Sequence, residues 1–264
     1  MDLIFVSIFF VLGLIIGSFL NVVVCRIGTH KTFGGRSFCM DCNTQIAWYD
    51  MFPVASFCVL RGRCRNCKSS ISSMYPIVEF ITGLVFAFLF LKFSNLFFAN
   101  SIEFALVYAF YAVIFSLLIV VSVYDLRHKI IPDILSLTLG ILSFASLFLI
   151  TEGHLGWHIP GWNAFLAGPM LAFPFAFFFF ISGGRWMGFG DAKLAISIGW
   201  ILGVSAGLGA LVLSFWTGAV VGIILILAKH YGMKSEVPFA PFLVFATAVT
   251  FLFGINILEV IGTL

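Results

Sequence analysis

The sequence predicts an all-α polytopic membrane protein with about eight transmembrane helices and a small zinc-binding loop domain. Three observations predict it. Of 264 residues, 62% are hydrophobic and 9% are charged, with a mean hydropathy of +1.15, whereas soluble domains are about half apolar and a quarter charged. The apolar residues form long unbroken runs, which favour helices over the alternating strands of a barrel. Lys and Arg gather in alternate connections between these runs.

Eight apolar runs are candidate spans, each near the roughly 20 residues that cross a hydrocarbon core of about 30 Å. The first begins after an acidic residue and reaches its first base only at Arg26, the reverse of a cleaved signal peptide, so we expect it to be retained. The boundary between the sixth and seventh is blurred by several glycines. The runs cover residues 3–24, 76–92, 103–124, 131–150, 164–182, 194–210, 212–228 and 242–262.

Small residues and prolines predict how these helices pack. Glycines four residues apart are typical of helices that approach closely in a membrane. Pro169 and Pro174 predict kinks in the fifth span, whose freed carbonyls need partners inside the bundle. The glycine pairs are Gly13 with Gly17, Gly203 with Gly207, and Gly218 with Gly222.

The basic residues predict the orientation. Thirteen of the fourteen Lys and Arg follow spans one, three, five or seven, and only Lys92 lies opposite. Because cytoplasmic connections carry an excess of Lys and Arg, we expect these connections in the cytoplasm and both termini outside. The net charge of +3 therefore reflects topology, and we expect a lipid bilayer and no nucleic acid as partner.

The polar stretch divides the chain into a first helix (1–24), a loop domain (25–75) and a membrane core (76–264). The loop domain contains CMDC (39–42) and CRNC (64–67). Four thiolates in two tight turns suit tetrahedral zinc, whereas the alternative of two disulfides is rare in a reducing cytoplasm. We expect zinc to stabilise a domain too small for a core of its own. Its ligands would be Cys39, Cys42, Cys64 and Cys67.

Three aspartates lie at cytoplasmic ends of predicted helices: Asp125 and Asp133 bound DLRHKIIPD, and Asp191 ends GFGD. A carboxylate at membrane depth usually faces the bundle interior and has a function. Two facing carboxylates share one proton, so one can activate water while the other donates to a carbonyl. Asp125 and Asp191 thus predict an aspartyl dyad for peptide hydrolysis. The alternative is that Asp191 only caps the sixth helix.

Further residues are expected to support this dyad. Gly188 and Gly190 lack a Cβ atom, so they permit close backbone approach and unusual φ values, and an extended substrate could lie against the turn that carries Asp191. We also assign Lys193 and Asp133 to the support of the site.

Six stretches in order resemble the type IV prepilin peptidase family, over nearly the whole chain. They are GSFLNVVVCR (17–26), the CxxC pair with LRGRCRNCKSSIS (60–72), YPIVEFITG (75–83), DLRHKIIPD (125–133), GFGDAK (188–193) and PFAPFL (238–243). The resemblance implies an aspartyl leader peptidase of the bacterial inner membrane that cleaves prepilins or pseudopilins at the cytoplasmic face. It implies that Asp125 and Asp191 are the catalytic pair and that the cysteine loop binds zinc.

The resemblance also implies N-methylation of the new N-terminus from S-adenosylmethionine. No Gly-x-Gly-x-x-Gly follows a predicted strand, so the donor site would be built from the loop and helix ends. Glu79, at the start of the second span, is the candidate anchor, with a first-turn dipole partner as the alternative. The chain departs from the family pattern in or beside the loop linked to methylation, at Gly28, Asp50, Phe57 and Met74.

Other classes share some of these features. Presenilin-like intramembrane proteases also use Tyr-Asp and Gly-x-Gly-Asp motifs, but they lack the cysteine loop and cut within the span. A transporter could relay protons through the aspartates. A zinc-stapled scaffold without catalysis would use Asp125 and Asp191 only as helix caps. The sequence does not indicate an oligomeric state.

Overall fold

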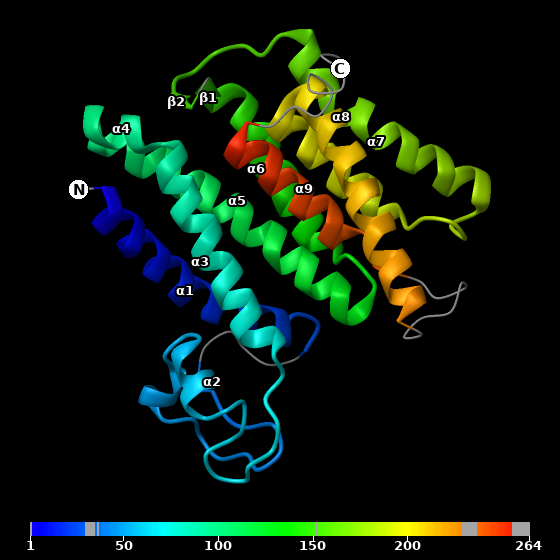
Figure 1. Ribbon diagram of the computed structural model, residues 1–264. Helices are drawn as coiled ribbons and strands as arrows, with labels where there is room; N and C mark the ends of the chain where they lie inside the picture. Colours follow the sequence, from blue (N-terminus) through cyan, green and yellow to red (C-terminus); the bar gives the residue numbers. More distant parts are fainter. Residues whose placement is uncertain (1, 30–34, 36, 152, 229–236, 255–264) are drawn as a thin grey trace. The chain divides into compact units, whose positions relative to one another are not determined.

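The computed structural model describes residues 2–29, 35, 37–151, 153–228 and 237–254, and most of them are helical (Figure 1). The chain forms two compact units, Met1–Leu91 and Lys92–Leu264, and each is described by itself. Extended structure within the described residues amounts to a single two-stranded hairpin and two isolated bridges. The all-α class predicted from the sequence is confirmed.

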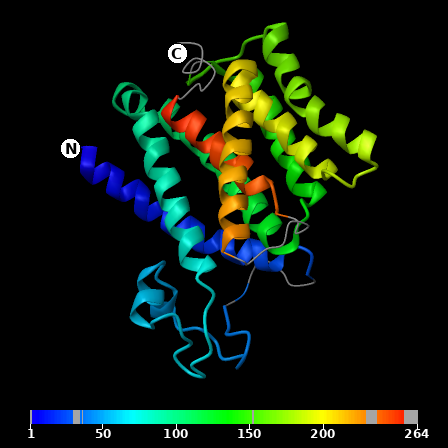
Figure 2. The same cartoon turned by 45° about the vertical axis from the view of Figure 1, so that its right-hand side comes forward.

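The first unit contains two long helices and a loop domain. Its elements are α1 (Asp2–Arg26), the 3₁₀ helix η1 (Trp48–Met51), α2 (Ala55–Val59) and α3 (Met74–Lys92). α1 and α3 lie side by side in both views (Figures 1 and 2).

The predicted close packing at Gly13 and Gly17 is confirmed in the contact between α1 and α3. A Cβ atom on Gly13 would lie 2.7 Å from the carbonyl oxygen of Thr82, and one on Gly17 would lie 2.7 Å from the Cα atom of Glu79. Because real Cβ atoms do not approach backbone atoms so closely, only glycine permits this contact.

The second unit is a helical bundle with α8 at its centre. Helices α6, α7 and α9 all contact α8, and α5 contacts α6 and α9. Its fully buried side chains include Ile114, Leu118, Leu139, Leu171, Leu194 and Leu243. Its elements are α4 (Ser94–Ala99), α5 (Ser101–His128), α6 (Asp133–Leu149), β1 (Ile150–Thr151), β2 (His154–Leu155), α7 (Trp162–Ser182), α8 (Phe189–Leu227) and α9 (Ala240–Phe253).

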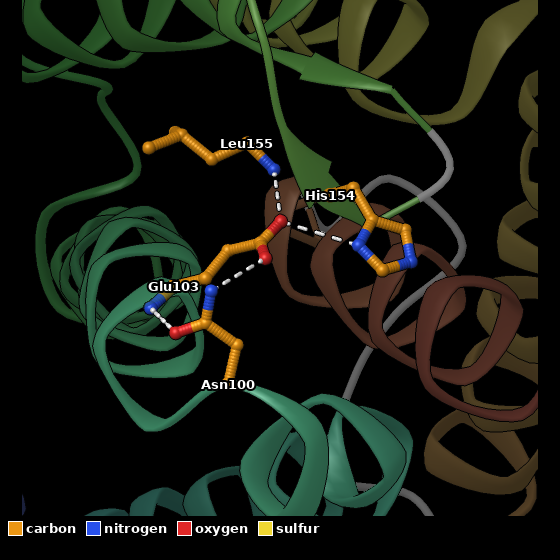
Figure 3. Close-up of polar contacts among 4 residues, drawn as sticks. All are labelled: Asn100, Glu103, His154 and Leu155. Carbon is orange, nitrogen blue, oxygen red and sulfur yellow. Dashed lines mark hydrogen bonds and ion pairs between the residues drawn. The ribbon is translucent and has the colours of Figure 1, made fainter.

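The start of α5 also holds the β1–β2 hairpin (Figure 3). The Asn100 side chain accepts a hydrogen bond from the backbone N–H of Glu103 at 3.3 Å, which caps the helix. The Glu103 carboxylate accepts one from the N–H of Leu155 at 2.9 Å and contacts Nδ1 of His154 at 3.2 Å. The sequence prediction lacks this hairpin, because strands of two residues leave no periodic pattern.

The predicted count of eight spans is not confirmed by the helix lengths. Among the described residues, five helices are long and apolar enough to cross a membrane, namely α1, α3, α5, α7 and α8. The apolar helices α6 and α9 have 17 and 14 residues. Residues 255–262, the end of the last predicted span, lie outside the described residues.

The boundary predicted at residue 211, between the sixth and seventh spans, is wrong. α8 has 39 residues, and its single break lies at Gly203, with φ 77° and ψ −178°. Essentially only glycine adopts this backbone conformation, because it has no Cβ atom. Figure 2 shows the two parts of α8 running in different directions.

The other predicted glycine pairs are only partly correct. Gly207 packs against the Leu171 side chain of α7 so closely that a Cβ atom would overlap it. A Cβ atom on Gly203 or Gly222 would meet nothing within 4 Å, and one on Gly218 would make an ordinary contact. Gly203 therefore supplies a backbone conformation, while close helix packing uses Gly207.

One of the two prolines in α7 has the partner that the sequence predicts. Pro169 has no N–H, so the carbonyl of Phe165 four residues earlier loses its helical hydrogen bond. The indole Nε1 of Trp200 in α8 donates to this carbonyl at 3.1 Å. The contact requires Gly168, where a Cβ atom would lie 2.6 Å from the same indole nitrogen.

Candidate active site and metal centre

The two aspartates of the predicted dyad lie at the ends of different helices in the second unit. Asp125 is in the last turn of α5, and Asp191 is in the first turn of α8. Asp125 is 6% exposed and Asp191 is half-buried. The charge of Asp125 acts on Asp191, so the structure brings the two carboxylates within electrostatic reach of each other.

Asp125 is held by the N-terminus of α9. Its Oδ2 atom accepts a hydrogen bond from the backbone N–H of Ala240 at 3.2 Å. Ala240 is the first residue of α9, and the preceding Phe239 offers no side-chain cap. Asp125 thus satisfies one of the donors left free at a helix start and lies at the positive end of the helix dipole.

Asp191 has a different environment. We find no hydrogen bond to its carboxylate among the described residues, whereas its backbone N–H is bonded to the carbonyl of Gly188 at 3.3 Å. The two carboxylates are therefore not equivalent, because only Asp125 is fixed by a donor.

The two glycines before Asp191 differ from each other, and the expectation of unusual φ values is wrong for both. Gly188 has φ −75° as the N-cap of α8, and Gly190 is not among the residues with positive φ. A Cβ atom on Gly190 would lie 3.0 Å from Cβ of Ile131, whereas one on Gly188 would meet nothing closer than 3.8 Å. Close backbone approach therefore depends on Gly190 alone.

Lys193 and Asp133 join the starts of α8 and α6. Lys193 Nζ lies 2.6 Å from Asp133 Oδ1 and 5.2 Å from the centroid of the Phe189 ring. The Asp133 side chain is 84% exposed, so the ion pair contributes little stability. Asp133 is thus paired with a lysine at the surface, next to the connection that contacts Gly190.

The four cysteines predicted to bind zinc lie together in the first unit. Their Sγ atoms are all within 4.8 Å of one another, and those of Cys39 and Cys67 are 3.8 Å apart. Tetrahedral zinc with Zn–S bonds of about 2.3 Å requires S–S distances of about 3.8 Å. The donor set therefore fits a four-thiolate zinc site. Cys25 and Cys58 are not part of this group.

The two CxxC turns have the same backbone design. In each turn, the first cysteine is bonded through its N–H to the residue five positions later and through its carbonyl to the residue four positions later. The residue four positions after the first cysteine has a positive φ, 54° for Asn43 and 62° for Lys68. The bonds are Cys39 N to Thr44 O at 2.9 Å, Asn43 N to Cys39 O at 3.0 Å, Cys64 N to Ser69 O at 2.8 Å, and Lys68 N to Cys64 O at 3.1 Å.

Hydrogen bonds favour the thiolate form of one of these cysteines. The backbone N–H groups of Cys42 and Asp41 donate to the sulfur of Cys39 and lower its pKa to about 6. The thiolate is the form that binds a metal ion. The second turn is tied to η1 by Arg65, which donates to both oxygens of Asp50 at 2.8 and 2.7 Å.

Glu79 has a structural partner in the first unit. It is 9% exposed, and its Oε2 atom accepts a hydrogen bond from the N–H of Val54 at 2.8 Å. Val54 has φ 60°, a costly conformation for a β-branched residue. Glu79 also bonds the side chain of Ser18, so its carboxylate links α1, α3 and the start of α2.

Sequence reasoning missed two of these partners. Neither Ala240, which bonds Asp125, nor Val54, which bonds Glu79, was assigned a role. Both act through a backbone N–H, which every residue except proline carries, so no residue-type signal could have found them. PFAPFL, which includes Ala240, is part of the family resemblance, but that stretch alone does not show what it contacts.

Acidic side chains at the ends of α5 and α8, long apolar helices and a four-thiol cluster fit the class of polytopic membrane peptidases of the aspartyl type. Residues 11–93 match the family model for the bacterial Peptidase A24 N-terminal domain, and residues 112–223 match that for the type IV leader peptidase family. The chain belongs to the type IV leader peptidase family and is a multi-pass membrane enzyme.

Its relatives include three curated proteins named prepilin leader peptidase/N-methyltransferase. The chain is 33% identical to the protein of Bacillus subtilis over 256 residues, which cover 96% of each. It is 29% identical to that of Aeromonas hydrophila, covering 95% of this chain and 91% of the relative. It is 27% identical to that of Pseudomonas aeruginosa, covering 92% and 88%. No solved structure matches. These relatives do not support the presenilin-like, transporter or scaffold alternatives.

Proposed function

We propose that Asp125 and Asp191 are the catalytic dyad of this peptidase and that its substrates are prepilins or pseudopilins. The observation that carries the proposal is that one compact unit places the carboxylates at the ends of α5 and α8 within electrostatic reach of each other. An acid pair of this kind holds one proton between its members, which provides the general base and the general acid that peptide hydrolysis needs.

The difference between the two environments supports an assignment of roles to the two carboxylates. Asp125 accepts the N–H of Ala240, so it acts as the ionised member and takes a proton from the attacking water. Asp191 acts as the protonated member and donates to the carbonyl oxygen of the scissile bond. When the tetrahedral intermediate collapses, Asp125 passes its proton to the leaving amine while Asp191 takes back the proton of a gem-diol hydroxyl, so the two products depart and the dyad again holds one proton.

The proposed location is the cytoplasmic face of the bacterial inner membrane, with both termini outside. The distribution of Lys and Arg supports it, because thirteen of fourteen fall on one side of the predicted topology. A substrate with a short basic leader and an apolar helix would insert with its leader on that same side. Its scissile bond would then reach the membrane boundary at which α5 ends and α8 begins.

The dyad is tested with purified enzyme and a synthetic prepilin in detergent, followed by mass measurement of the products. Asp125→Asn and Asp191→Asn should each abolish cleavage, and the double variant should be little worse than either, because the pair acts as a unit. Asp133→Asn tests the predicted supporting role: Asp133 is exposed and paired with Lys193, so this variant should lower cleavage without abolishing it. Cleavage by either dyad variant would remove that residue from the proposal.

We infer a structural zinc ion bound by the four clustered cysteines. When bound, it would hold the two CxxC turns together, as the Asn66–Thr44 hydrogen bond of 2.9 Å already does in part. Cys64→Ser should lower the zinc content, about one per chain in the natural protein, and expose residues 36–70 to proteolysis. Cys58→Ser should change neither. Metal-free protein with an equally protected loop would exclude a structural metal.

Methyl transfer from S-adenosylmethionine is the second proposed activity, supported by the names of the relatives and by the family resemblance. Glu79 is buried and bonded to Val54, which fits a positioning carboxylate better than a residue open to a methyl donor. We propose that Glu79 acts by fixing the loop domain on α3. Glu79→Gln should then spare cleavage and reduce transfer of labelled methyl groups, with increased proteolysis of the loop. Reduced transfer without loosening of the loop would instead indicate a direct role.

A further inference from the structure

The loop domain carries an apolar surface that its own fold leaves uncovered. In and after η1, Trp48 is 71% exposed, Tyr49 50%, Met51 42% and Phe52 56%. The Trp48 ring meets those of Tyr49 and Phe52 edge to face, with centroids 5.7 and 6.2 Å apart. We call these four residues the aromatic surface. Exposed apolar clusters of this kind mark interaction sites.

The aromatic surface is continuous with an exposed apolar side of α1. Trp48, Met51 and Phe52 line one groove of about 360 Å³ together with Ile15 and Phe19 of α1. Ile15 and Phe19 are 55% and 53% exposed, and they belong to a helix long and apolar enough to cross a membrane. In a multi-pass membrane protein such side chains contact hydrocarbon. The exposed apolar surface of α1 therefore extends onto the loop domain.

The composition of the aromatic surface fits the boundary between hydrocarbon and water. Trp and Tyr are enriched at that boundary, because an apolar ring ends in a polar group. Arg65 lies 5.4 Å from the centroid of the Tyr49 ring, so a cation accompanies the rings. Met51 and Phe52 supply apolar area without charge. This combination is typical of segments that lie in a membrane interface.

The charge of the loop domain selects the kind of lipid. Residues 25–75 contain seven basic and two acidic residues, and the balance stays positive even if a zinc tetrathiolate of net charge −2 is counted. Clustered Lys and Arg next to a transmembrane helix are attracted to anionic headgroups. The basic residues are Arg26, Lys31, Arg36, Arg61, Arg63, Arg65 and Lys68, and the acidic ones are Asp41 and Asp50.

We propose that the aromatic surface rests in the headgroup region of an anionic bilayer, so that the zinc-binding loop domain is a membrane-surface domain and not a loop free in water. The occupant of the groove between η1 and α1 is then lipid. This proposal concerns residues of the first unit only and does not depend on the assignment of the dyad.

The experiment uses the full-length protein in nanodiscs and the fluorescence of Trp48. The chain has six tryptophans, so the Trp48 emission is the difference between the natural protein and Trp48→Phe, which keeps an aromatic ring at this position. The nanodiscs contain phosphatidylcholine brominated either near the glycerol backbone or near the chain end, with or without phosphatidylglycerol. Trp48 emission should be quenched most by the shallow bromine atoms and more strongly when phosphatidylglycerol is present.

Three outcomes would overturn the proposal. The first is that no bromolipid quenches the Trp48 emission, while aqueous acrylamide quenches it as strongly in nanodiscs as in detergent. This result would place the aromatic surface in water. Equal quenching with and without phosphatidylglycerol would remove the role of anionic lipid. Protection from acrylamide only after addition of a prepilin would assign the groove to substrate. Hydrogen exchange of residues 46–53, compared between the two lipid mixtures, checks the natural sequence without any substitution.

Discussion

Replacement of Gly190 should impair cleavage, whereas replacement of Gly188, two residues earlier, should not. The change to alanine is the same at both positions, but the surroundings differ. A Cβ atom on Gly190 would lie 3.0 Å from Cβ and 3.3 Å from Cγ1 and Cδ1 of Ile131, while on Gly188 the closest atom would be 3.8 Å away. Because the Cβ atom of Ile131 is fixed to its backbone, relief requires movement of the 129–132 connection or of α8 at Asp191.

The magnitude follows from two opposing contributions. Overpacking of this kind costs about 1–3 kcal/mol, and replacement of glycine by alanine inside a helix gains back about 1 kcal/mol. If the remaining energy, up to about 2 kcal/mol, appears as displacement of Asp191 in the transition state, kcat/KM should fall by up to roughly 30-fold for Gly190→Ala. Gly188→Ala should stay within about twofold, because it meets no close atom and has an ordinary φ of −75°.

The assay is cleavage of a synthetic prepilin by each purified variant, with the thermal unfolding temperature in detergent as a check on folding. Ile131→Ala removes two of the three close atoms, so the double variant Gly190→Ala/Ile131→Ala should recover part of the activity. Equal losses for the two glycine variants, or a larger loss at Gly188, would refute the steric account of this turn.

Three further predictions concern the rest of the fold. Gly203→Ala should lower the unfolding temperature measured in detergent, because alanine at φ 77° is strained by about 1–3 kcal/mol. Gly222→Ala should leave the unfolding temperature unchanged, because a Cβ atom at this position would meet no atom within 4 Å. Gly17→Ala should weaken the docking of α1, since its Cβ atom would lie 2.7 Å from the backbone of α3; exchange or crosslinking between the two helices measures it. Arg65 lowers the pKa of Asp50 in the folded protein, so the ionised Asp50 stabilises the fold fully above its unfolded pKa of about 3.9, and this stability is lost as the pH falls through the lower folded pKa. Asp50→Asn should therefore remove the increase in proteolysis of residues 36–70 that acid causes in the natural protein. An unchanged dependence of proteolysis on pH would contradict this prediction.

Local patterns were sufficient for long helices such as α5 and α7 and for the four clustered cysteines. The run predicted at 103–124 lies within α5 (Ser101–His128), and that at 164–182 lies within α7 (Trp162–Ser182), because unbroken apolar sequence is enough to specify a helix in lipid. The CxxC spacing likewise identified four cysteines whose sulfur atoms lie together, since two cysteines three residues apart share one turn.

Tertiary structure decided which helix ends meet. Asp125 is bonded to Ala240, 115 residues later, and Glu79 is bonded to Val54. In both pairs the donor is a backbone N–H, which leaves no trace in residue type. The sequence offered Asp125 and Asp191 as a pair by their predicted face, but only the packing of α5, α8 and α9 gave them unequal surroundings.

The glycines separate the two levels most clearly. From the sequence, Gly203 and Gly207 predict one kind of contact, and Gly188 and Gly190 another. In the structure, Gly203 breaks α8 while Gly207 packs on Leu171, and only Gly190 is crowded by its neighbour. Composition therefore determined that this chain is a helical membrane protein with a thiol cluster and acidic helix ends. Contacts between distant segments decide which glycine breaks a helix, which glycine packs against a neighbouring helix and which carboxylate accepts a hydrogen bond. Steric fit and backbone hydrogen bonds of this kind arise only when those segments meet.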